Sequence, residues 1–366
     1  MAHKVIISGG GTGGHIFPAI AIANALKQLA PDTEILFVGA NGKMEMERVP
    51  AAGYEIVGLD IAGINRQSML KNIGLPFKMI KSLWKARKVL KQFKAEAAIG
   101  VGGYASGPLL MMANMIGLPT ILQEQNSYAG LTNKKLGKKA KRICVAYEGM
   151  ERFFPKDKLL LTGNPIRKAS VKIEGKREEA IHAFQLDLNK KTLLVTGGSL
   201  GALTLNDCLE AGIPALVSAG IQVIWQCGSY YYEQLNGRLA EQLPKEVKLM
   251  PFLDRMDYAY AAADIIVARA GAGTISELCV VGKPVVLIPS PNVSDDHQTK
   301  NALSLSKHHA ALLVKDQDAR QELIPKILDL IQQPEEQATL GENIKKLALP
   351  DADVVIAKEI LNIIKN

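Results

Sequence analysis

Three glycine-rich turns carry the residue types best suited to binding a charged ligand. They read GGGTGGH at residues 9–15, GVGGYASGP at 100–108 and TGGSLGA at 196–202. Each follows a short apolar run, which is the pattern of a strand that leads into a helix. Glycine at such a turn leaves backbone N–H groups uncovered at a helix N-terminus, where they bind anions such as phosphate. Close packing of strand on helix explains one such turn, but it does not explain all three.

His15 ends the first glycine-rich turn and precedes Pro18, an arrangement that is typical of the first helical turn of a helix. An imidazole at this position is suited to act as a general base or to bind a phosphate. The structural alternative is a histidine that caps its own turn. The residues alone leave these interpretations open.

The first turn also has Gly9, Gly11 and Gly14 in the spacing of a dinucleotide-binding motif. In such enzymes an acidic residue closes the next strand and holds the ribose. Here the next apolar run ends in Val-Gly-Ala-Asn at residues 38–41, without an acid. The sequence therefore argues against a dehydrogenase. None of the three turns ends in the Gly-Lys-Ser/Thr of a P-loop either.

The most informative stretch of the second half is RAGAGTISE at residues 269–277. Thr274 and Glu277 have the spacing of a capping box, in which the Thr hydroxyl caps a helix and the Glu carboxylate bonds back to the Thr amide. We expect this structural role from the spacing. The functional alternative is that Glu277 accepts hydrogen bonds from a ligand diol such as a ribose, since a carboxylate has two oxygens.

A polar loop, SDDHQTKNA at residues 294–302, follows another apolar run. Its place at the carboxyl end of a strand puts His297 and Gln298 in the same predicted pocket. The alternative is a solvated loop in which Asp295 or Asp296 caps a helix. No isolated Asp-x-Asp stands near a glycine turn. We therefore expect neither a metal-dependent diphosphate site nor a metal cofactor.

Short apolar runs alternate with helical patterns along the whole chain. The runs are rich in β-branched residues and apolar on both faces, which is typical of parallel strands covered by helices on both sides. The predicted class is therefore α/β, doubly wound. The runs lie at residues 4–9, 34–39, 97–102, 119–123, 142–146, 192–197, 222–228, 264–269 and 284–289.

This rhythm breaks in a polar segment at residues 163–191, and a second series of runs starts at Thr192. We place a domain boundary near residue 165. Open α/β sheets bind ligands at the carboxyl ends of their strands, and all three glycine turns lie at such ends. We expect a small-molecule site in a cleft between the two domains.

Composition limits the class of protein further. The chain has 366 residues, enough for two domains. It carries 44 Lys and Arg against 36 Asp and Glu, a net charge of +8 that favours acidic partners. No secretory signal and no uninterrupted apolar run of about 20 residues stands in the sequence. The cysteines have neither zinc-site nor redox spacing, which predicts reduced thiols in a cytosolic protein. They are Cys144, Cys208, Cys227 and Cys279.

A basic and apolar stretch runs from Ile61 to Ala95 without one acidic residue. Such a helix is suited to lie in an anionic membrane interface. The alternatives are an ordinary core-facing helix and a solvated charged face. RNA is a weaker candidate, because no RNA-binding signature or aromatic platform accompanies the charges. The basic residues are Arg66, Lys71, Lys78, Lys81, Lys85, Arg87, Lys88, Lys91 and Lys94, and a second run comprises Lys134, Lys135, Lys138, Lys139, Lys141 and Arg142.

Seven motifs, in order and over nearly the whole chain, resemble those of the MurG family of bacterial cell-wall glycosyltransferases. They are GGGTGGHIFPAIAIA, GVGGYASGP, QEQNSYAGLTNK, LTGNPIR, TGGSLGA, RAGAGTISE and DDHQTKNA. The resemblance implies the GT-B fold of glycosyltransferase family 28, with two Rossmann-like doubly wound domains and an interdomain cleft. Residues 1–165, joined by a C-terminal helix at 351–366, would bind the lipid-linked acceptor and the membrane. Residues 166–350 would bind UDP-N-acetylglucosamine (UDP-GlcNAc).

The implied activity is that of an inverting hexosyltransferase. N-acetylglucosamine (GlcNAc) would pass to the 4-hydroxyl of the MurNAc in undecaprenyl-pyrophosphoryl-MurNAc-pentapeptide (lipid I), forming lipid II. This step serves peptidoglycan synthesis, and with it cell shape and cell division. His15 and Glu124 are the implied candidates for the base. The alternatives are a GT-B enzyme acting on another lipid, such as a diacylglycerol glycosyltransferase, and a non-catalytic module that binds a nucleotide sugar or RNA.

The resemblance assigns further residues to the two substrates. Those on the acceptor side are Gly102, Gly103, Tyr104 and Ser106. For the donor UDP-GlcNAc, the resemblance places Thr12, Gly13 and Gly14 near the sugar and diphosphate, Asn126 on the GlcNAc and Gln298 on the sugar hydroxyls. It places Arg167 and Ser199 on phosphate oxygens. The nucleoside would be bound by Phe252 and Leu253 at the uracil and by Ala272, Gly273, Thr274 and Glu277, with Glu277 on the ribose.

The chain departs from the family pattern at two positions. Gln123 stands where members often have His, so we expect no proton transfer there. Leu200 stands where many have Gln, which removes a side-chain amide but keeps the backbone turn. The resemblance further implies a peripheral protein on the cytoplasmic face of the inner membrane, with no metal or other cofactor and no nucleic acid. It leaves open protein partners in cell-wall synthesis or division.

Overall fold

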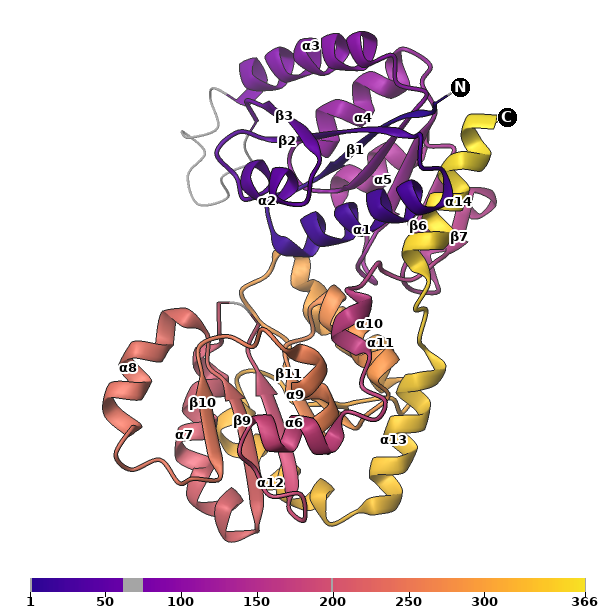
Figure 1. Ribbon diagram of the computed structural model, residues 1–366. Coiled ribbons are helices and arrows are strands. Elements are labelled where there is room, and N and C mark those ends of the chain that lie inside the picture. Colours follow the sequence, from indigo (N-terminus) through magenta and orange to yellow (C-terminus); the bar gives the residue numbers. More distant parts are fainter. Residues whose placement is uncertain (1, 62–74, 199, 366) are drawn as a thin grey trace. The chain divides into compact units, whose positions relative to one another are not determined.

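The computed structural model describes residues 2–61, 75–198 and 200–365. These form two compact units (Figure 1). Unit 1 comprises Met1–Ile166 and Leu349–Asn366, and unit 2 comprises Arg167–Ala348. The boundaries expected from the sequence lie after residue 165 and before residue 351.

Unit 1 is built on a seven-stranded parallel sheet with the order β3-β2-β1-β4-β5-β6-β7. Its register pairs Val5 of β1 with Ile35 of β2 on one side and with Ala97 of β4 on the other. The strands are β1 (Lys4–Gly9), β2 (Glu34–Ala40), β3 (Glu55–Leu59), β4 (Ala97–Gly102), β5 (Thr120–Glu124), β6 (Arg142–Val145) and β7 (Leu159–Leu161).

Helices cover both faces of this sheet, because successive strand residues point to opposite sides. Val5 and Ile7 are buried in one core cluster and Ile6 in the other. The helices on the first face are α1 (Gly13–Leu29), α2 (Glu45–Ala51) and α14 (Ala352–Lys365), and those on the second are α3 (Leu75–Phe93), α4 (Ser106–Met115) and α5 (Leu131–Gly137). Two short 3₁₀ helices, η2 (Met150–Arg152) and η3 (Lys156–Lys158), precede β7.

The C-terminal helix α14 belongs to unit 1, where it packs against α1 (Figure 1). Ile356 and Ile360 of α14 are fully buried in the same cluster as Ile22 and Leu26 of α1. At its solvent-facing side, Glu359 accepts a hydrogen bond of 2.6 Å from the Arg142 guanidinium. Apolar burial therefore explains why the chain returns to its first unit at its end.

Unit 2 contains a six-stranded parallel sheet with the order β10-β9-β8-β11-β12-β13. Its strands are β8 (Lys191–Thr196), β9 (Ile221–Gln226), β10 (Val247–Met250), β11 (Ile265–Ala268), β12 (Val285–Leu287) and β13 (Leu312–Leu313). Its helices are η4 (Lys168–Val171), α6 (Arg177–Ala183), α7 (Leu203–Ser218), α8 (Ser229–Leu239), α9 (Met256–Ala262), α10 (Ala272–Val281), η5 (Ser294–Asp296), α11 (His297–Ser306), α12 (Ala319–Ile331) and α13 (Pro334–Lys346).

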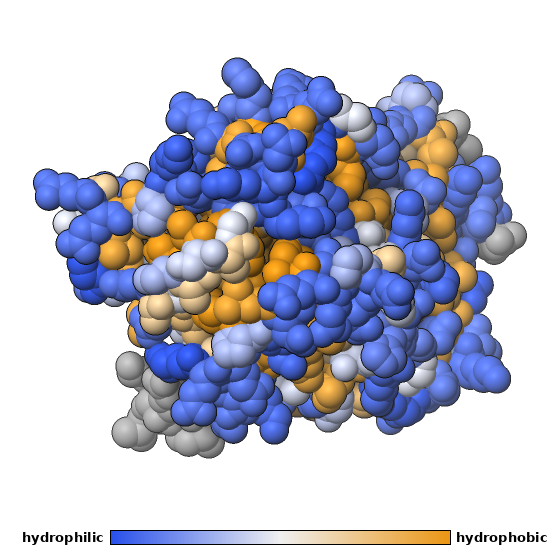
Figure 2. Space-filling view, turned by 90° about the horizontal axis from the view of Figure 1, so that it is seen from below, coloured by the Kyte–Doolittle hydropathy of each residue, from blue (hydrophilic) through white to orange (hydrophobic). Residues whose placement is uncertain are grey.

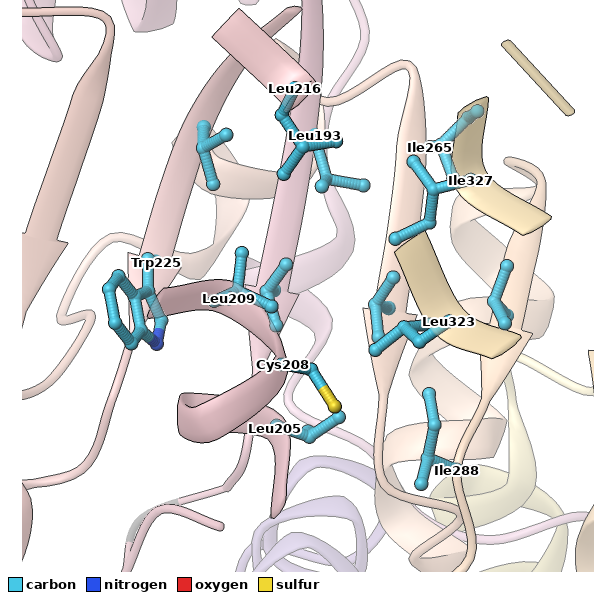
Figure 3. Packing of buried hydrophobic residues seen from close by; sticks show 14 of the residues in the cluster. Leu193, Leu205, Cys208, Leu209, Leu216, Trp225, Ile265, Ile288, Leu323 and Ile327 are labelled. Carbon is cyan, nitrogen blue, oxygen red and sulfur yellow. The ribbon is translucent and has the colours of Figure 1, made fainter. Parts of the chain in front are cut away.

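One core of unit 2 lies between this sheet and helices α7 and α12 (Figure 3). Trp225 of β9 is fully buried there, and its indole N–H donates to the Asn206 side chain of α7 at 3.0 Å. Leu323 and Ile327 of α12 face the strands from the same side. On the face of the molecule seen in Figure 2, hydrophilic residues surround smaller apolar areas, as on most protein surfaces.

The predicted α/β class with doubly wound parallel sheets is confirmed in both units. Each sheet reverses its strand order once, between β1 and β4 in unit 1 and between β8 and β11 in unit 2. Ligands of open α/β sheets bind at such switch points, beyond the carboxyl ends of the strands. Both positions carry glycine-rich turns in this chain.

The structure also bears on the sequence features that concern membranes and thiols. Within the described ranges, none of the helices is both long and apolar enough to cross a bilayer. All four cysteines are buried as free thiols. Burial raises the pKa of Cys144 to about 12 and that of Cys208 to about 11, so neither is a reactive thiolate at neutral pH.

Candidate functional site

Two glycine turns meet at the switch point of unit 1. The Gly10 amide at the end of β1 donates to the Gly102 carbonyl at the end of β4, at 3.2 Å. Gly102 and Gly103 have φ values of +107° and +94°, and a Cβ on Gly103 would lie 2.4 Å from the Gly10 carbonyl oxygen. Glycine is required here because the two backbones pack directly on each other.

His15 lies at this junction, in the first turn of α1. Its backbone N–H donates to the Thr12 carbonyl at 3.1 Å. Its ring lies against the second turn, since a Cβ on Gly102 would be 2.5 Å from His15 Nδ1. Thr12 and Gly14, the residues around it, are exposed. The fold therefore fixes an imidazole at the carboxyl edge of the sheet, where a ligand is expected.

Pro18 lies further along α1 than predicted. The helix begins at Gly13, so Pro18 stands in its second turn rather than its first. Because proline has no N–H, the Gly14 carbonyl receives no helical hydrogen bond from position 18. This part of the prediction from the sequence is wrong.

Glu45 is a residue of this region that the sequence did not single out. It is a buried carboxylate at the start of α2, and it accepts hydrogen bonds from the Gly11 amide at 2.8 Å and the Ala40 amide at 3.0 Å. A Cβ on Gly10 would lie 2.2 Å from its Oε1. Glu45 therefore supports the first glycine turn from inside. It accepts a hydrogen bond from the Gly11 amide, and in other proteins with such turns a ligand phosphate accepts from this kind of amide.

Replacing Glu45 with alanine is expected to lower the free energy of unfolding by about 2–3 kcal/mol, because two amides lose their acceptor. Chemical denaturation with urea measures this loss. Glu47→Ala, an exposed residue of the same helix, is the matched control and should change stability by less than about 0.5 kcal/mol. Equal losses for the two variants would contradict the supporting role of Glu45.

Glu124, the second candidate base, organises the loop that follows β5. Its Oε1 accepts from the Asn126 amide at 3.1 Å, and its Oε2 accepts from the Gly130 amide at 3.1 Å and from Asn133 Nδ2 at 2.9 Å. Burial raises the pKa of Glu124, whereas these hydrogen bonds lower it. Since both oxygens are engaged, the geometry favours a positioning role for Glu124 and leaves His15 as the better placed base.

The acceptor-side residues of the second turn differ in their exposure. Ser106 is buried, with its hydroxyl 2.8 Å from the Gly102 carbonyl and 3.1 Å from the Ser8 carbonyl. It therefore holds the two turns together. Tyr104 is the member of this group with an exposed ring. Gln123 is also buried and donates to Asn164 Oδ1 at 2.8 Å, a structural contact.

In unit 2 the predicted capping box is wrong. Helix α10 begins at Ala272 with Gly271 as its N-cap and has no side-chain cap, so Thr274 lies inside the first turn. Glu277 instead interacts with two other segments. Its Oε2 accepts from the Tyr260 hydroxyl of α9 at 3.2 Å, and its Oε1 lies 3.5 Å from Nε of Arg167.

This cluster combines the buried acidic side chain of Glu277 with the exposed basic side chain of Arg167. Burial raises the pKa of Glu277, and the Arg167 charge and the Tyr260 hydroxyl both lower it. The Arg167 side chain is 51% exposed, whereas that of Glu277 is 11% exposed. A carboxylate that accepts diol hydroxyls thus stands beside a guanidinium that can bind phosphate.

Further residues assigned to UDP-GlcNAc lie in unit 2. Gln298 Oε1 accepts from the Ser290 amide at 2.8 Å, which fixes its side chain at the end of β12. Leu253 is buried and Phe252 is half exposed after β10. Ser199 lies outside the described residues. The neighbouring Leu200, where many family members have Gln, is highly exposed.

A partly buried ion pair, which the sequence did not reveal, supports this edge of unit 2. Arg269 at the end of β11 pairs with Asp316 and donates to the Ile288 carbonyl at 3.1 Å. Asp316 in turn accepts from the Thr204 hydroxyl of α7 at 3.0 Å. The partners are far apart in sequence, so no spacing in the chain predicts them. Over the parts of the chain that the structure describes, no three His, Cys, Asp or Glu side chains are grouped to hold a metal ion.

The candidate residues thus fall into two groups, one in each unit. In unit 1 they are Thr12, Gly13, Gly14, His15, Gly102, Gly103, Tyr104, Ser106, Glu124 and Asn126. Those in unit 2 are Arg167, Phe252, Leu253, Ala272, Gly273, Thr274, Glu277 and Gln298. The interdomain cleft stays a prediction.

Two family models match the chain. Residues 5–145 match the glycosyltransferase family 28 N-terminal domain, and residues 192–356 match the family 28 C-terminal domain.

Similar proteins span the whole chain. A protein of Phocaeicola vulgatus is 55% identical over 362 residues, covering 98% of this chain and 96% of its own length. One of Cytophaga hutchinsonii is 55% identical over 362 residues, covering 99% and 97%. Both are named UDP-N-acetylglucosamine–N-acetylmuramyl-(pentapeptide) pyrophosphoryl-undecaprenol N-acetylglucosamine transferase.

Solved structures agree with these matches. The crystal structure of MurG from Acinetobacter baumannii is 27% identical and superposes with a TM-score of 0.79 over 99% of this chain and 100% of that one. A UDP-GlcNAc 2-epimerase from Neisseria meningitidis, at 14% identity and a TM-score of 0.66 over 99% of this chain and 100% of its own, shares the fold.

Proposed function

The chain belongs to the MurG family of family 28 glycosyltransferases, and on that premise we propose that it transfers GlcNAc from UDP-GlcNAc to lipid I. The acceptor is the 4-hydroxyl of MurNAc, and the products are lipid II and UDP. Inversion at the anomeric carbon follows from a single displacement, in which the acceptor oxygen attacks as the bond to the diphosphate breaks.

The reaction makes two demands on the protein. The acceptor hydroxyl must lose a proton as the new bond forms, and negative charge must be stabilised on the leaving UDP. His15 at the first switch point is the base in this proposal, and Glu124 positions the loop that follows β5. Arg167 and the uncovered amides at helix N-termini stabilise the diphosphate in this proposal, so the reaction needs no metal ion.

The observation that carries the donor assignment is the cluster of Arg167, Glu277 and Tyr260. A buried carboxylate in the second turn of α10, next to an exposed guanidinium, matches the chemistry of a ribose linked to a diphosphate. Release of UDP from UDP-GlcNAc, measured with a lipid I analogue, with diacylglycerol and with no acceptor, tests the function. We expect UDP release only when the lipid I analogue is the acceptor, and we expect it both with and without a metal chelator. UDP release only when diacylglycerol is the acceptor would favour the second candidate acceptor.

We also propose that unit 1 binds the cytoplasmic face of the cell membrane through α3 and α4, which pack against each other. Phe77, Ile80 and Trp84 of α3 share one face of the helix by their spacing, and all three are exposed. Met111 and Met115 of α4 are exposed as well. Other apolar residues of α3, such as Ala86 and Leu90, are buried in the core. The helix thus carries apolar residues both for the core and for a lipid surface.

Basic residues surround these apolar side chains. Lys78 and Lys85 belong to the described part of the stretch, whereas Arg66 and Lys71 lie outside the described residues. Lys81 pairs with Asp60 at 3.2 Å, so part of its charge is balanced within unit 1. The remaining charge supports attraction to anionic lipids. Such a surface would place the enzyme where its acceptor is anchored, among the proteins of cell-wall synthesis and division.

The double variant Phe77→Ser, Trp84→Ser is expected to bind anionic vesicles at least about tenfold more weakly, because each aromatic side chain contributes about 1.5–3 kcal/mol when it leaves water. Sedimentation with phosphatidylglycerol vesicles measures this. Tyr230→Ser, which removes an aromatic ring of unit 2 that is 82% exposed, is the control. Unchanged vesicle binding of the double variant would remove α3 from the proposed membrane surface.

A further inference from the structure

Tyr260 is a buried side chain of unit 2 that the sequence did not single out and that has no separate role in the proposed mechanism. It is 1% exposed, and its hydroxyl donates to Glu277 Oε2 at 3.2 Å. Burial and the neighbouring Glu277 charge keep the pKa of Tyr260 well above its usual value, so the hydroxyl stays protonated and can act as a donor.

The backbone of Tyr260 is fixed as well. Lys283, which follows α10, donates from Nζ to the carbonyls of Tyr260 at 2.6 Å and Ala261 at 2.8 Å. Lys283 also donates to the carbonyl of Ala263. These carbonyls end helix α9 and receive no helical N–H of their own. The Tyr260 ring is therefore anchored at its backbone and aims its hydroxyl at one oxygen of Glu277.

The two oxygens of Glu277 have different surroundings. Oε2 faces the buried Tyr260 hydroxyl, whereas Oε1 faces the half-exposed Arg167 guanidinium at 3.5 Å. A carboxylate held at one oxygen keeps a fixed rotamer. It then presents the other oxygen in one direction, which a ligand hydroxyl can meet without an ordering cost.

We propose that Tyr260 is a positioning residue for nucleotide specificity, which holds Glu277 so that its Oε1 accepts hydrogen bonds from a ribose cis-diol. The inference rests on the proposed function, since it takes Glu277 to contact the ribose of UDP-GlcNAc. It adds that discrimination between ribose and deoxyribose depends on the Tyr260 hydroxyl, which lies outside the nucleotide pocket. Tyr260 itself does not touch the substrate.

The test compares the binding of UDP and of 2′-deoxy-UDP by isothermal titration calorimetry. The parent protein should prefer UDP, because a site built for a hydroxyl rejects an analogue that lacks it. Tyr260→Phe should weaken UDP binding by about tenfold, the equivalent of about 1.4 kcal/mol, and should weaken 2′-deoxy-UDP binding less, because this analogue offers Glu277 only the 3′-hydroxyl. The preference for ribose then falls. KM for UDP-GlcNAc should rise accordingly, while kcat changes by less than about twofold.

Tyr258→Phe is the matched control. Tyr258 lies on the same helix, and its hydroxyl bonds to another carboxylate, that of Glu179. This variant removes the same atom from the same helix but should keep the ribose preference of the parent. The ratio of the two dissociation constants does not depend on the folded fraction of the sample, so partial unfolding of either variant does not imitate the expected result.

The outcomes separate this inference from the proposed function. An unchanged ribose preference in Tyr260→Phe, with transfer to the lipid I analogue intact in the parent, would overturn the role of Tyr260 alone. A parent that binds UDP but transfers no sugar would overturn the proposed function, while the binding ratio still decides on Tyr260. Equal loss of UDP and 2′-deoxy-UDP binding would show a general structural role and would also overturn the inference.

Discussion

Replacing His15 with alanine is expected to lower kcat for GlcNAc transfer by about 10²–10⁴-fold, the usual contribution of a positioned general base. The Kd for UDP-GlcNAc should change by less than about threefold, because in this proposal the imidazole acts on the acceptor hydroxyl, and the Arg167 and Glu277 cluster for the nucleotide lies in unit 2. Steady-state kinetics with a lipid I analogue, together with calorimetric donor binding, measure the two quantities separately.

Two further variants sharpen this prediction. Gly102→Ala keeps the imidazole but places a Cβ 2.5 Å from its Nδ1 at a φ of +107°, so the ring must move and kcat should fall as well. His182→Ala removes an exposed histidine of α6 and should have no effect on kcat. Equal losses in donor binding and in kcat for His15→Ala would contradict its role as the base.

Arg167→Ala is expected to lower kcat/KM for UDP-GlcNAc by about 10²–10³-fold, as the loss of a group that stabilises transition-state charge does. The variant loses the cation for the diphosphate, and Glu277 loses its ion-pair partner at 3.5 Å. Without that charge the pKa of Glu277, already raised by burial, rises further. Arg167→Lys should recover part of the activity, since it restores the charge without the planar fork.

Arg320→Ala is the control for this experiment. Arg320 has similar exposure and pairs with Asp207 on the surface of the same unit. Its loss should leave kcat/KM within about twofold of the parent, as exposed ion pairs contribute little. An Arg167→Ala variant as active as Arg320→Ala would remove Arg167 from the donor site.

The strands of this protein show which part of the fold its sequence specifies. The nine predicted runs correspond to β1, β2, β4, β5, β6, β8, β9, β11 and β12, which are the inner strands of both sheets. The four strands that were missed, β3, β7, β10 and β13, are the four edges. Inner strands are buried on both faces and read as continuous β-branched runs. Edge strands such as the two-residue β13 are short and partly exposed, so their pattern is weak.

The candidate site divides in a similar way. The glycine turns could be predicted, because glycine is the residue type that readily adopts the positive φ found at positions such as Gly102. The capping box of Thr274 and Glu277 was predicted wrongly from a spacing that is correct for such a box. The helix starts at Ala272, so Thr274 is not its N-cap. The Glu277 carboxylate instead accepts a hydrogen bond from Tyr260 and pairs with Arg167.

The sequence by itself determined the fold class, the glycine turns at the carboxyl ends of strands and the family, since these depend on local apolar patterns and on motifs that are contiguous in the chain. Only the tertiary structure decided the role of each acidic side chain. Glu45 and Glu124 bind backbone amides inside unit 1, whereas Glu277 lies between Tyr260 and an exposed arginine. The physical reason is that burial and hydrogen-bond partners set the properties of a carboxylate, and some of these partners, such as Gly11 for Glu45 and Arg167 for Glu277, come from segments far away along the chain.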